Sequence, residues 1–305
     1  MKQFAKVMQL ERQLKIALDE SRLLILGAQV LFGFQFNGIF QEQFKDLSFS
    51  SQASLCVGLP LIMIAVALLI APSMEHRIVE RGQDSPRVLP LATLFGGFAL
   101  LPLSIALALD MFVAMEPISS EATAILAGVT FFSLAMLCWY VLAWILKRKT
   151  EPMAQAPPKP TPLETQVDQL LTEARVIIPG AQALLGFQLT VTLTRAFQDL
   201  PAQPKLAHAA ALCCIGLAVI LLMAPASLHR ISFGGQDDPD FVKIGSFFVV
   251  AAPFPLALGI SLDTYVAAGR ALQSDASAVI LAVAAALVLL GLWYVYPLWR
   301  RMTAA

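Results

Sequence analysis

The chain carries the same segment twice, 153 residues apart. The tripeptide Gly-Ala-Gln at positions 27–29 returns at 180–182, and the alignment continues without a gap. Residues 20–110 and 173–263 are identical at 34 of 91 positions. Self-similarity over so long a period means that each copy is one structural unit. We therefore predict a tandem duplication of a single folding unit.

The composition predicts a membrane protein. Hydrophobic residues make up 58% of the 305 residues, charged residues 14%, and the mean hydropathy is +0.72. An aqueous globule of this size needs more polar surface. Apolar runs long enough to cross a hydrocarbon layer of roughly 30 Å recur in both copies, and each copy adds a more polar first span. The predicted spans are 23–40, 54–71, 88–109, 122–146, 176–193, 207–224, 241–262 and 278–298. The expected fold is an all-α integral membrane protein with eight transmembrane helices.

The positions of the basic residues orient these spans. If the amino terminus is cytoplasmic, 17 of the 21 lysines and arginines fall on cytoplasmic segments, and the outer loops hold only Lys45, Arg195, Lys205 and Arg270. This bias follows the positive-inside rule and predicts that both termini are cytoplasmic. Four spans per copy give the two halves the same orientation. We expect two parallel four-helix repeats related by a pseudo-two-fold axis along the membrane normal.

Four regions follow from these patterns. Residues 1–20 alternate apolar and basic side chains, which predicts an amphipathic cytoplasmic helix. Residues 21–148 form the first membrane repeat. Residues 149–165 contain most of a proline-rich stretch and are expected to form an extended cytoplasmic linker. Residues 166–305 form the second membrane repeat.

The first span of each copy carries a polar stripe. At 100° per residue, small and amide side chains and one arginine fall on one face of each helix. The stripe consists of Arg22, Gln29, Gly33 and Asn37 in the first copy, and of Arg175, Gln182, Gly186 and Thr190 in the second. It could line a narrow wet path, or it could bind helices together, since glycine allows close approach and glutamine hydrogen-bonds between helices. Both interpretations bury the stripe. Gln35 and Gln188 point away from it.

A His-Arg motif follows the second span of each copy. His76-Arg77 and His229-Arg230 come shortly after an Ala-Pro pair at the inner end of the span. One interpretation is a structural anchor at the membrane interface. The other is a sensor of pH or of anionic headgroups, because the pKa of an unperturbed histidine is about 6.5.

Asp110 and Asp263 end a span in both copies. About 22 residues separate Asp110 from the start of its span, and at 1.5 Å per residue this distance of roughly 33 Å places the carboxylate at the outer surface. No charged residue lies near the centre of a predicted span. Ion-coupled carriers commonly bury an ionisable group, so this pattern argues against a carboxylate-based proton antiporter.

Aromatic residues precede the basic residues at the inner end of each copy. They are Trp139, Tyr140, Trp144, Trp293, Tyr294 and Trp299. Tryptophan and tyrosine gather at membrane–water interfaces, so these positions predict an inner aromatic belt.

Each copy resembles a bacterial family of four-span membrane proteins that is catalogued only as a domain of unknown function. The resemblance covers about residues 20–145 and 173–300. In this chain the family pattern is matched by Gly27, Gln29, Leu31, Phe32, Phe34, Ala71, Pro72, His76, Arg77, Glu173, Arg175 and Val176. The chain departs from the usual form in its tandem fusion, and Leu185 replaces a motif phenylalanine. The resemblance implies a bacterial cytoplasmic (inner) membrane location, and some relatives carry an automatic sodium/proton antiporter label.

The sequence argues against several classes of function and leaves two open. The chain has no Gly-x-Ser-x-Gly, phosphate-loop or His-Glu-x-x-His motif and only three histidines, so we expect no enzyme activity, no metal site and no cofactor. No basic stretch suggests nucleic acid.

The leading hypothesis is a small ion channel or transport-related protein for a monovalent cation or proton, with the polar stripes as its path. The alternative is a non-transporting membrane scaffold, or a pH or lipid sensor acting through the His-Arg loops. Membrane lipids are expected partners, and the duplication makes an oligomer possible.

Overall fold

The computed structural model describes residues 21, 24–83, 87–116, 120–145, 161–192, 194–233 and 236–304. In this part of the chain the fold is entirely helical. A first helix, Leu24–Ile39, comes before the labelled elements. The others are η1 (Glu42–Asp46), α2 (Phe49–Ile78), α3 (Val88–Met115), α4 (Glu121–Met136), η2 (Leu137–Val141), α5 (Leu142–Ile145), α6 (Leu163–Thr192), α7 (Arg195–Gln198), α8 (Ala202–Ile231), α9 (Pro239–Ala251), α10 (Pro253–Leu272), α11 (Asp275–Leu290), η3 (Gly291–Val295) and α12 (Tyr296–Ala304).

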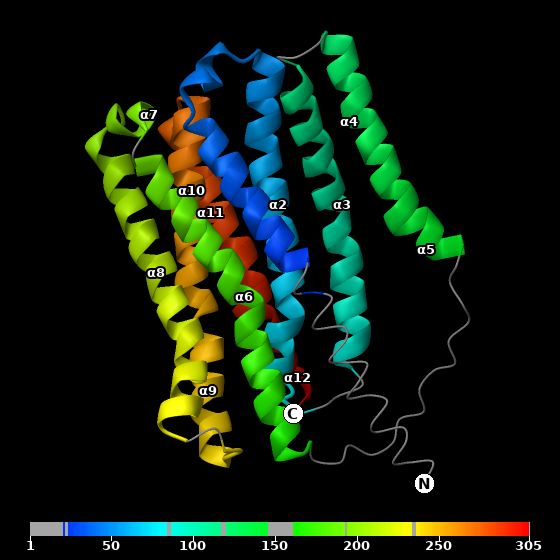
Figure 1. Ribbon diagram of the computed structural model, residues 1–305, viewed down its shortest axis with the longest axis vertical. Helices are drawn as coiled ribbons and strands as arrows, with labels where there is room; N and C mark the ends of the chain where they lie inside the picture. The colour runs from blue at the N-terminus through cyan, green and yellow to red at the C-terminus, as the bar shows by residue number, and fades with distance from the viewer. Residues whose placement is uncertain are drawn as a thin grey trace.

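The helices form a bundle whose long members run side by side (Figure 1). Seven helical stretches of the described residues are long and apolar enough to cross a membrane, with α9 and α10 counted together and α4 and α11 extended by the segments that follow them. Leu24–Ile39 is a shorter apolar helix at the position of the remaining predicted span. The all-α membrane fold is therefore confirmed, with seven long spans plus this shorter helix where eight were predicted.

Local signals set the helix ends. Ser48 caps α2 by accepting a hydrogen bond from the Ser51 N–H, and Asp238 caps α9 with Pro239 as the first helical residue. Beyond the end of α2, Gly82 has φ +73° and donates its N–H to the His76 carbonyl at 3.0 Å. That backbone conformation favours glycine. We call the end of the bundle where α2 and α8 finish the His-Arg end, and the opposite end the far end.

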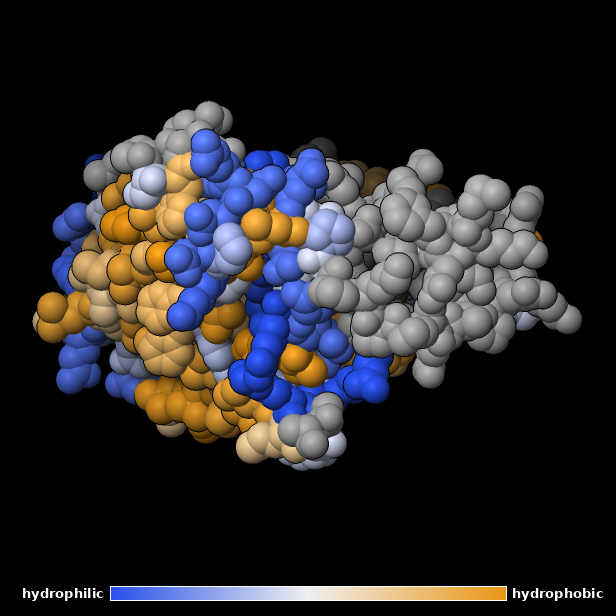
Figure 2. Space-filling model, turned by 90° about the horizontal axis from the view of Figure 1, so that it is seen from below, coloured by the Kyte–Doolittle hydropathy of each residue, from blue (hydrophilic) through white to orange (hydrophobic). Residues whose placement is uncertain are grey.

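Hydrophobic side chains cover much of the flank of the bundle, as an end-on view from the His-Arg end shows (Figure 2). Hydrophilic side chains gather across the end itself. This distribution fits helices whose sides face acyl chains and whose ends face water.

The two repeats share a layout but differ at their last helices. In both, the third helix packs against the second, and the fourth packs against the third. In the second repeat α11, η3 and α12 also pack against α2 of the first repeat. Among the described residues, α4 makes no comparable contact with α8, and it leans away from the bundle (Figure 1). The inner core therefore joins α2 to the second repeat.

Trp293 helps to explain this difference. It is fully buried on η3 and donates its indole N–H to the Ala67 carbonyl of α2 at 3.0 Å. Its prediction as part of an interfacial aromatic belt is wrong, because the side chain fills the contact between repeats. Trp144 and Trp299 are exposed. The tyrosines bond within their repeats, Tyr140 to the Gly97 carbonyl and Tyr294 to the Val250 carbonyl, each at 2.6 Å.

The second repeat begins earlier than predicted. Helix α6 starts at Leu163, inside the predicted linker 149–165, and continues through the first span without a break. Pro162 precedes its first turn, where a residue that has no N–H and a fixed φ is well tolerated. The predicted amphipathic helix at 1–20 and most of the predicted linker lie outside the described residues.

Candidate functional site

Each repeat holds a glutamine–aspartate pair that joins its first helix to its third. Gln35 donates from Nε2 to Asp110 Oδ1 at 2.6 Å. Gln188 donates from Nε2 to Asp263 Oδ2 at 2.7 Å. The two pairs occupy the same positions in the repeats, 153 residues apart. The duplication has therefore produced the same hydrogen bond twice.

The carboxylates lie inside the protein. Asp263 is fully buried and Asp110 is partly buried. Asp263 precedes the end of α10 by nine residues, or roughly 13 Å along the axis. Helix length predicts a position near the outer end of a span, but it does not report how far neighbouring helices cover a side chain. Asp263 is therefore a buried carboxylate that the argument from helix length did not anticipate.

Each carboxylate has one oxygen without a hydrogen bond. Asp110 Oδ2 and Asp263 Oδ1 are buried atoms that have no hydrogen-bond partner within the described structure. Burying an ionised carboxylate is costly unless it is paired and fully hydrogen-bonded. The free oxygen of each pair is therefore a place where a proton can bind.

The second pair has an additional partner in His208. Its Nδ1 lies 3.5 Å from Asp263 Oδ1, and its Nε2 lies 3.1 Å from the Gln188 carbonyl. The imidazole is fully buried between two aromatic rings, stacked on Phe36 and tilted against Phe197. Leu55 stands at the equivalent position of the first repeat. The two sites therefore share the Gln–Asp bond, and the second site alone has an imidazole beside the carboxylate.

The predicted polar stripe does not form a shared lining. In the second repeat all its members are exposed, namely Arg175, Gln182, Gly186 and Thr190. In the first repeat Gln29 and Gly33 are buried and Asn37 is half-buried, while Arg22 lies outside the described residues. The prediction that both stripes are buried is wrong. Helix α6 packs against α8 and α9, and its other face carries Gln188, which reaches Asp263 of α10.

Gln29 is packed against protein instead of water. Its side chain lies directly on the backbone of Gly180, so that a methyl group there would overlap the amide. The void beside it has a volume of about 10 Å³ and is lined by Gln29, Phe32, Met63, Val66, Leu184 and Ile260. Such a void has room for about one water molecule. This contact fits the interpretation of the stripe as a helix–helix contact better than that of a path.

A second buried polar cluster joins the two repeats at the His-Arg end. His76 Nδ1 lies 2.7 Å from Glu173 Oε1, and Arg77 donates from Nε to the other carboxylate oxygen. Arg77 also donates to the Ser246 hydroxyl at 3.2 Å. His76, Arg77 and Glu173 are all buried. In this copy both side chains bind a carboxylate of the other repeat, so they form a buried structural contact and do not face lipid headgroups.

The neighbouring loop fits around Arg77. A methyl group on Gly82 would come within 2.7 Å of Arg77 Nη1, so the absence of a side chain there makes room for the guanidinium. In the second repeat His229 is half-buried and packs against the Phe241 ring at 4.7 Å. The side chain of Arg230 lies outside the described residues, as does Glu20, the sequence equivalent of Glu173.

Sequence reasoning missed the partners of the predicted residues. Gln35, Gln188 and Glu173 repeat in register between the copies, as do the aspartates, and this coincidence was the available signal. His208 has no such signal, because the first repeat has leucine in its place. No group of three histidine, cysteine, aspartate or glutamate side chains suited to a metal ion occurs in the part of the chain that the structure describes.

The fold and these sites define a multi-helix membrane protein built from two copies of one unit. The chain belongs to a family of unknown function (DUF6328), whose model matches it twice, over residues 5–143 and 161–297. The two matches confirm the tandem duplication and the predicted family. No curated protein and no solved structure matches the chain.

Proposed function

We propose that the protein is transport-related and that its two Gln–Asp pairs take up and release protons. The observation that carries this proposal is the partial burial of Asp110 and the full burial of Asp263, each with one oxygen that accepts no hydrogen bond from the described residues, Asp263 Oδ1 lying 3.5 Å from His208 Nδ1. An ionisable side chain within a membrane span is a functional-site hypothesis by default, because it is costly to keep there. Among the described residues no arginine or lysine pairs with Asp110 or Asp263, so an ion pair with a permanently charged base does not explain their burial.

A polar basin at the far end supports access to the second pair. Its volume is about 330 Å³, and its charged and polar lining residues are Lys45, Asp199, Tyr265, Arg270, Gln273 and Asp275. Two of its lining residues, Val266 and Arg270, follow Asp263 by three and seven residues. They therefore lie on the same face of α10 as Asp263. A proton entering from this basin would have to pass one to two helical turns to reach Asp263.

The orientation is part of the proposal. We propose that the protein lies in a bacterial cytoplasmic membrane with both termini in the cytoplasm, because 17 of 21 basic residues then fall on cytoplasmic segments. In this orientation the His-Arg end is cytoplasmic. The Gln–Asp pairs and the basin then lie toward the outer side.

Proton flux into proteoliposomes tests the proposal. Vesicles containing a pH-sensitive dye would be subjected to a pH gradient of either sign, with the double variant Asp110→Asn/Asp263→Asn beside the wild type. We expect flux above that of empty vesicles in the wild type and background flux in the double variant. Gln182→Leu is the control, because Gln182 is exposed and contacts neither pair. Wild-type flux at background level, or full flux in the double variant, would contradict the proposal.

A second candidate function is a non-transporting scaffold or pH sensor. The packing of Gln29 against protein, beside a void of only about 10 Å³, and the buried His76–Glu173 contact favour it, since histidine can change charge near physiological pH. Glu173 of α6 contacts both His76 and Arg77, and Glu75, which precedes His76 in α2, lies 3.4 Å from Arg300 of α12. This candidate predicts background flux together with a pH-dependent distance between α2 and α6, measured by paired spin labels at exposed sites.

A further inference from the structure

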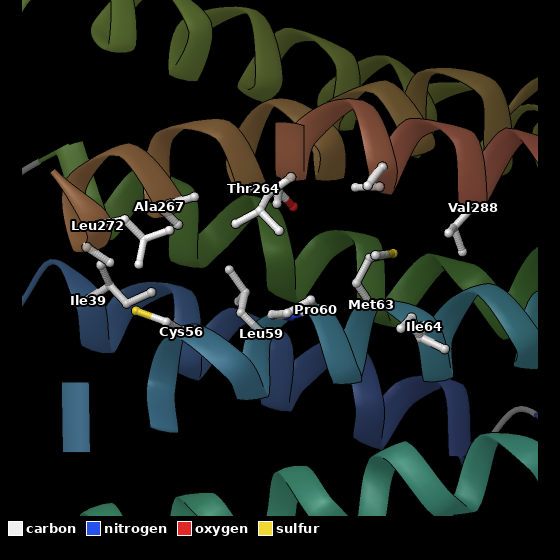
Figure 3. Close-up of a pocket in the computed structure, with 15 residues that line it drawn as sticks. Ile39, Cys56, Leu59, Pro60, Met63, Ile64, Thr264, Ala267, Leu272 and Val288 are labelled. Atoms are coloured by element: carbon white, nitrogen blue, oxygen red, sulfur yellow. The ribbon is translucent and has the colours of Figure 1, made fainter. Parts of the chain in front are cut away.

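An apolar cavity lies between the two repeats, within the spans (Figure 3). Its volume is about 150 Å³. Cys56, Leu59 and Met63 line it from α2, and alanines of α10 and α11 line it from the second repeat. The space exists because the residues facing α2 are small, namely Ala267, Ala268, Ala271, Ala284 and Ala285. This contact has no counterpart between α8 and α4 in the described residues.

The lining offers almost nothing to a polar ligand. Among the described residues that line it, Thr264 alone has a hydroxyl, and this hydroxyl already donates to the Ile260 carbonyl at 2.8 Å. Water needs two to four polar partners to occupy a cavity, and apolar cavities of about this volume stay dry and bind small hydrophobic molecules. The occupant is therefore expected to be a hydrocarbon.

The cavity is elongated along the helices. Ile39 and Leu272 lie at one end of it, and Ile64 and Val288 lie toward the other (Figure 3). Ile39 and Leu272 each end their helix at the far end of the bundle, so the cavity runs from there toward the middle of α2. From Cys56 to Ile64 the helix rises roughly 12 Å. A chain lying parallel to the helices matches this shape better than a compact molecule does.

The mouth of the cavity faces the lipid. Leu272 and Ala284 are exposed, and Cys56, Pro60 and Ile64 are partly exposed. These positions belong to membrane-spanning helices, whose solvent is the acyl chains of the bilayer. We propose that the cavity binds a segment of one acyl chain of a phospholipid from the leaflet at the far end, and that this segment fills the contact between the repeats.

Native mass spectrometry of the full-length protein tests this site. Protein stripped of lipid in detergent would be titrated with phosphatidylglycerol that has two oleoyl chains. We expect the wild type to retain one lipid more tightly than the rest. Ala267→Leu and Ala271→Leu, made separately, should each weaken that binding about tenfold, because the added methyl groups occupy the cavity. Ala210→Leu is the matched control on the exposed surface of α8 and should retain the lipid.

A second variant keeps the test independent of folding. Leu59→Ala enlarges the cavity, so it should bind the lipid at least as tightly as the wild type while lowering stability without lipid. Added phosphatidylglycerol should then raise its unfolding temperature more than that of Ala271→Leu. Equal lipid retention in the wild type, Ala267→Leu, Ala271→Leu and Ala210→Leu would overturn the proposal, as would a wild type without a tightly retained lipid. Both outcomes are independent of proton flux.

Discussion

His76 Nδ1 lies 2.7 Å from Glu173 Oε1, and this contact joins α2 of the first repeat to α6 of the second. The other oxygen of Glu173 accepts from Arg77. One carboxylate thus binds two cationic or potentially cationic side chains of the opposite repeat. Since all three side chains are buried, this cluster holds the repeats together at the His-Arg end.

Glu173→Gln should destabilise the protein strongly. Removing one partner of a buried ion pair leaves the other charge uncompensated, which typically costs about 3–5 kcal/mol. The loss is measurable as a lower unfolding midpoint in detergent. Arg175→Gln, two residues along the same helix, is the control because Arg175 is exposed. If both variants unfold at the wild-type midpoint, the cluster does not hold the repeats together.

Asp263→Ala should cost stability that Asp263→Asn largely retains. Alanine leaves the buried Gln188 amide and one His208 nitrogen without the carboxylate, and an unsatisfied buried polar group costs about 1–3 kcal/mol. Asparagine keeps an acceptor for Gln188. Chemical unfolding in detergent measures the difference, with Asp199→Ala as an exposed control. Equal stability of the alanine and asparagine variants would show that the Gln188 bond contributes little.

The fold was largely predictable because its signals are long and repeated. Apolar runs predict the membrane spans and basic loops predict their orientation, and both patterns extend over tens of residues. Because the unit is duplicated, each pattern occurs twice in the chain. Which face of a helix packs against the rest of the protein is harder to predict. The polar stripe of the first helix can face other helices or face outward. Here Gln29 packs inward against Gly180, whereas the equivalent Gln182 is exposed.

The sites were less predictable because they depend on contacts between distant segments. Gln35 and Asp110 are 75 residues apart, as are Gln188 and Asp263, and only the packing of first on third helix brings them together. A depth estimate along one helix cannot show such coverage. Pairing residues that recur in both copies would have indicated the right candidates.

Gly180→Ala should destabilise the contact between the first helices of the repeats. The new methyl group would occupy the position of the Gln29 amide, and overpacking of a tight contact typically costs about 1–3 kcal/mol. Gly186→Ala, on the same helix, meets none of the described residues within 4 Å and should be neutral or slightly stabilising. Unfolding midpoints of the two variants check this pair. A Gly180→Ala protein as stable as Gly186→Ala would contradict the close approach of Gln29.

We expect Glu116 to make the stability of the fold at the far end depend on pH. This can be tested without changing the Gln–Asp pairs or the His76–Glu173 contact. Glu116 follows α3, outside the span, and hydrogen bonds from Ser48 and Ser51 lower the pKa of its carboxyl from the ordinary value of 4.5. A group whose pKa is lower in the folded state stabilises the fold above its ordinary value, and the contribution is lost as the pH falls through the folded pKa. Ser51→Ala should therefore raise the Glu116 pKa toward 4.5, observable by carboxyl carbon NMR titration. It should also reduce the loss of stability below about pH 4.5.

Ser50→Ala is the control, since Ser50 is exposed beside Ser51. An unchanged Glu116 pKa in Ser51→Ala would show that the Ser51 hydroxyl does not stabilise the carboxylate.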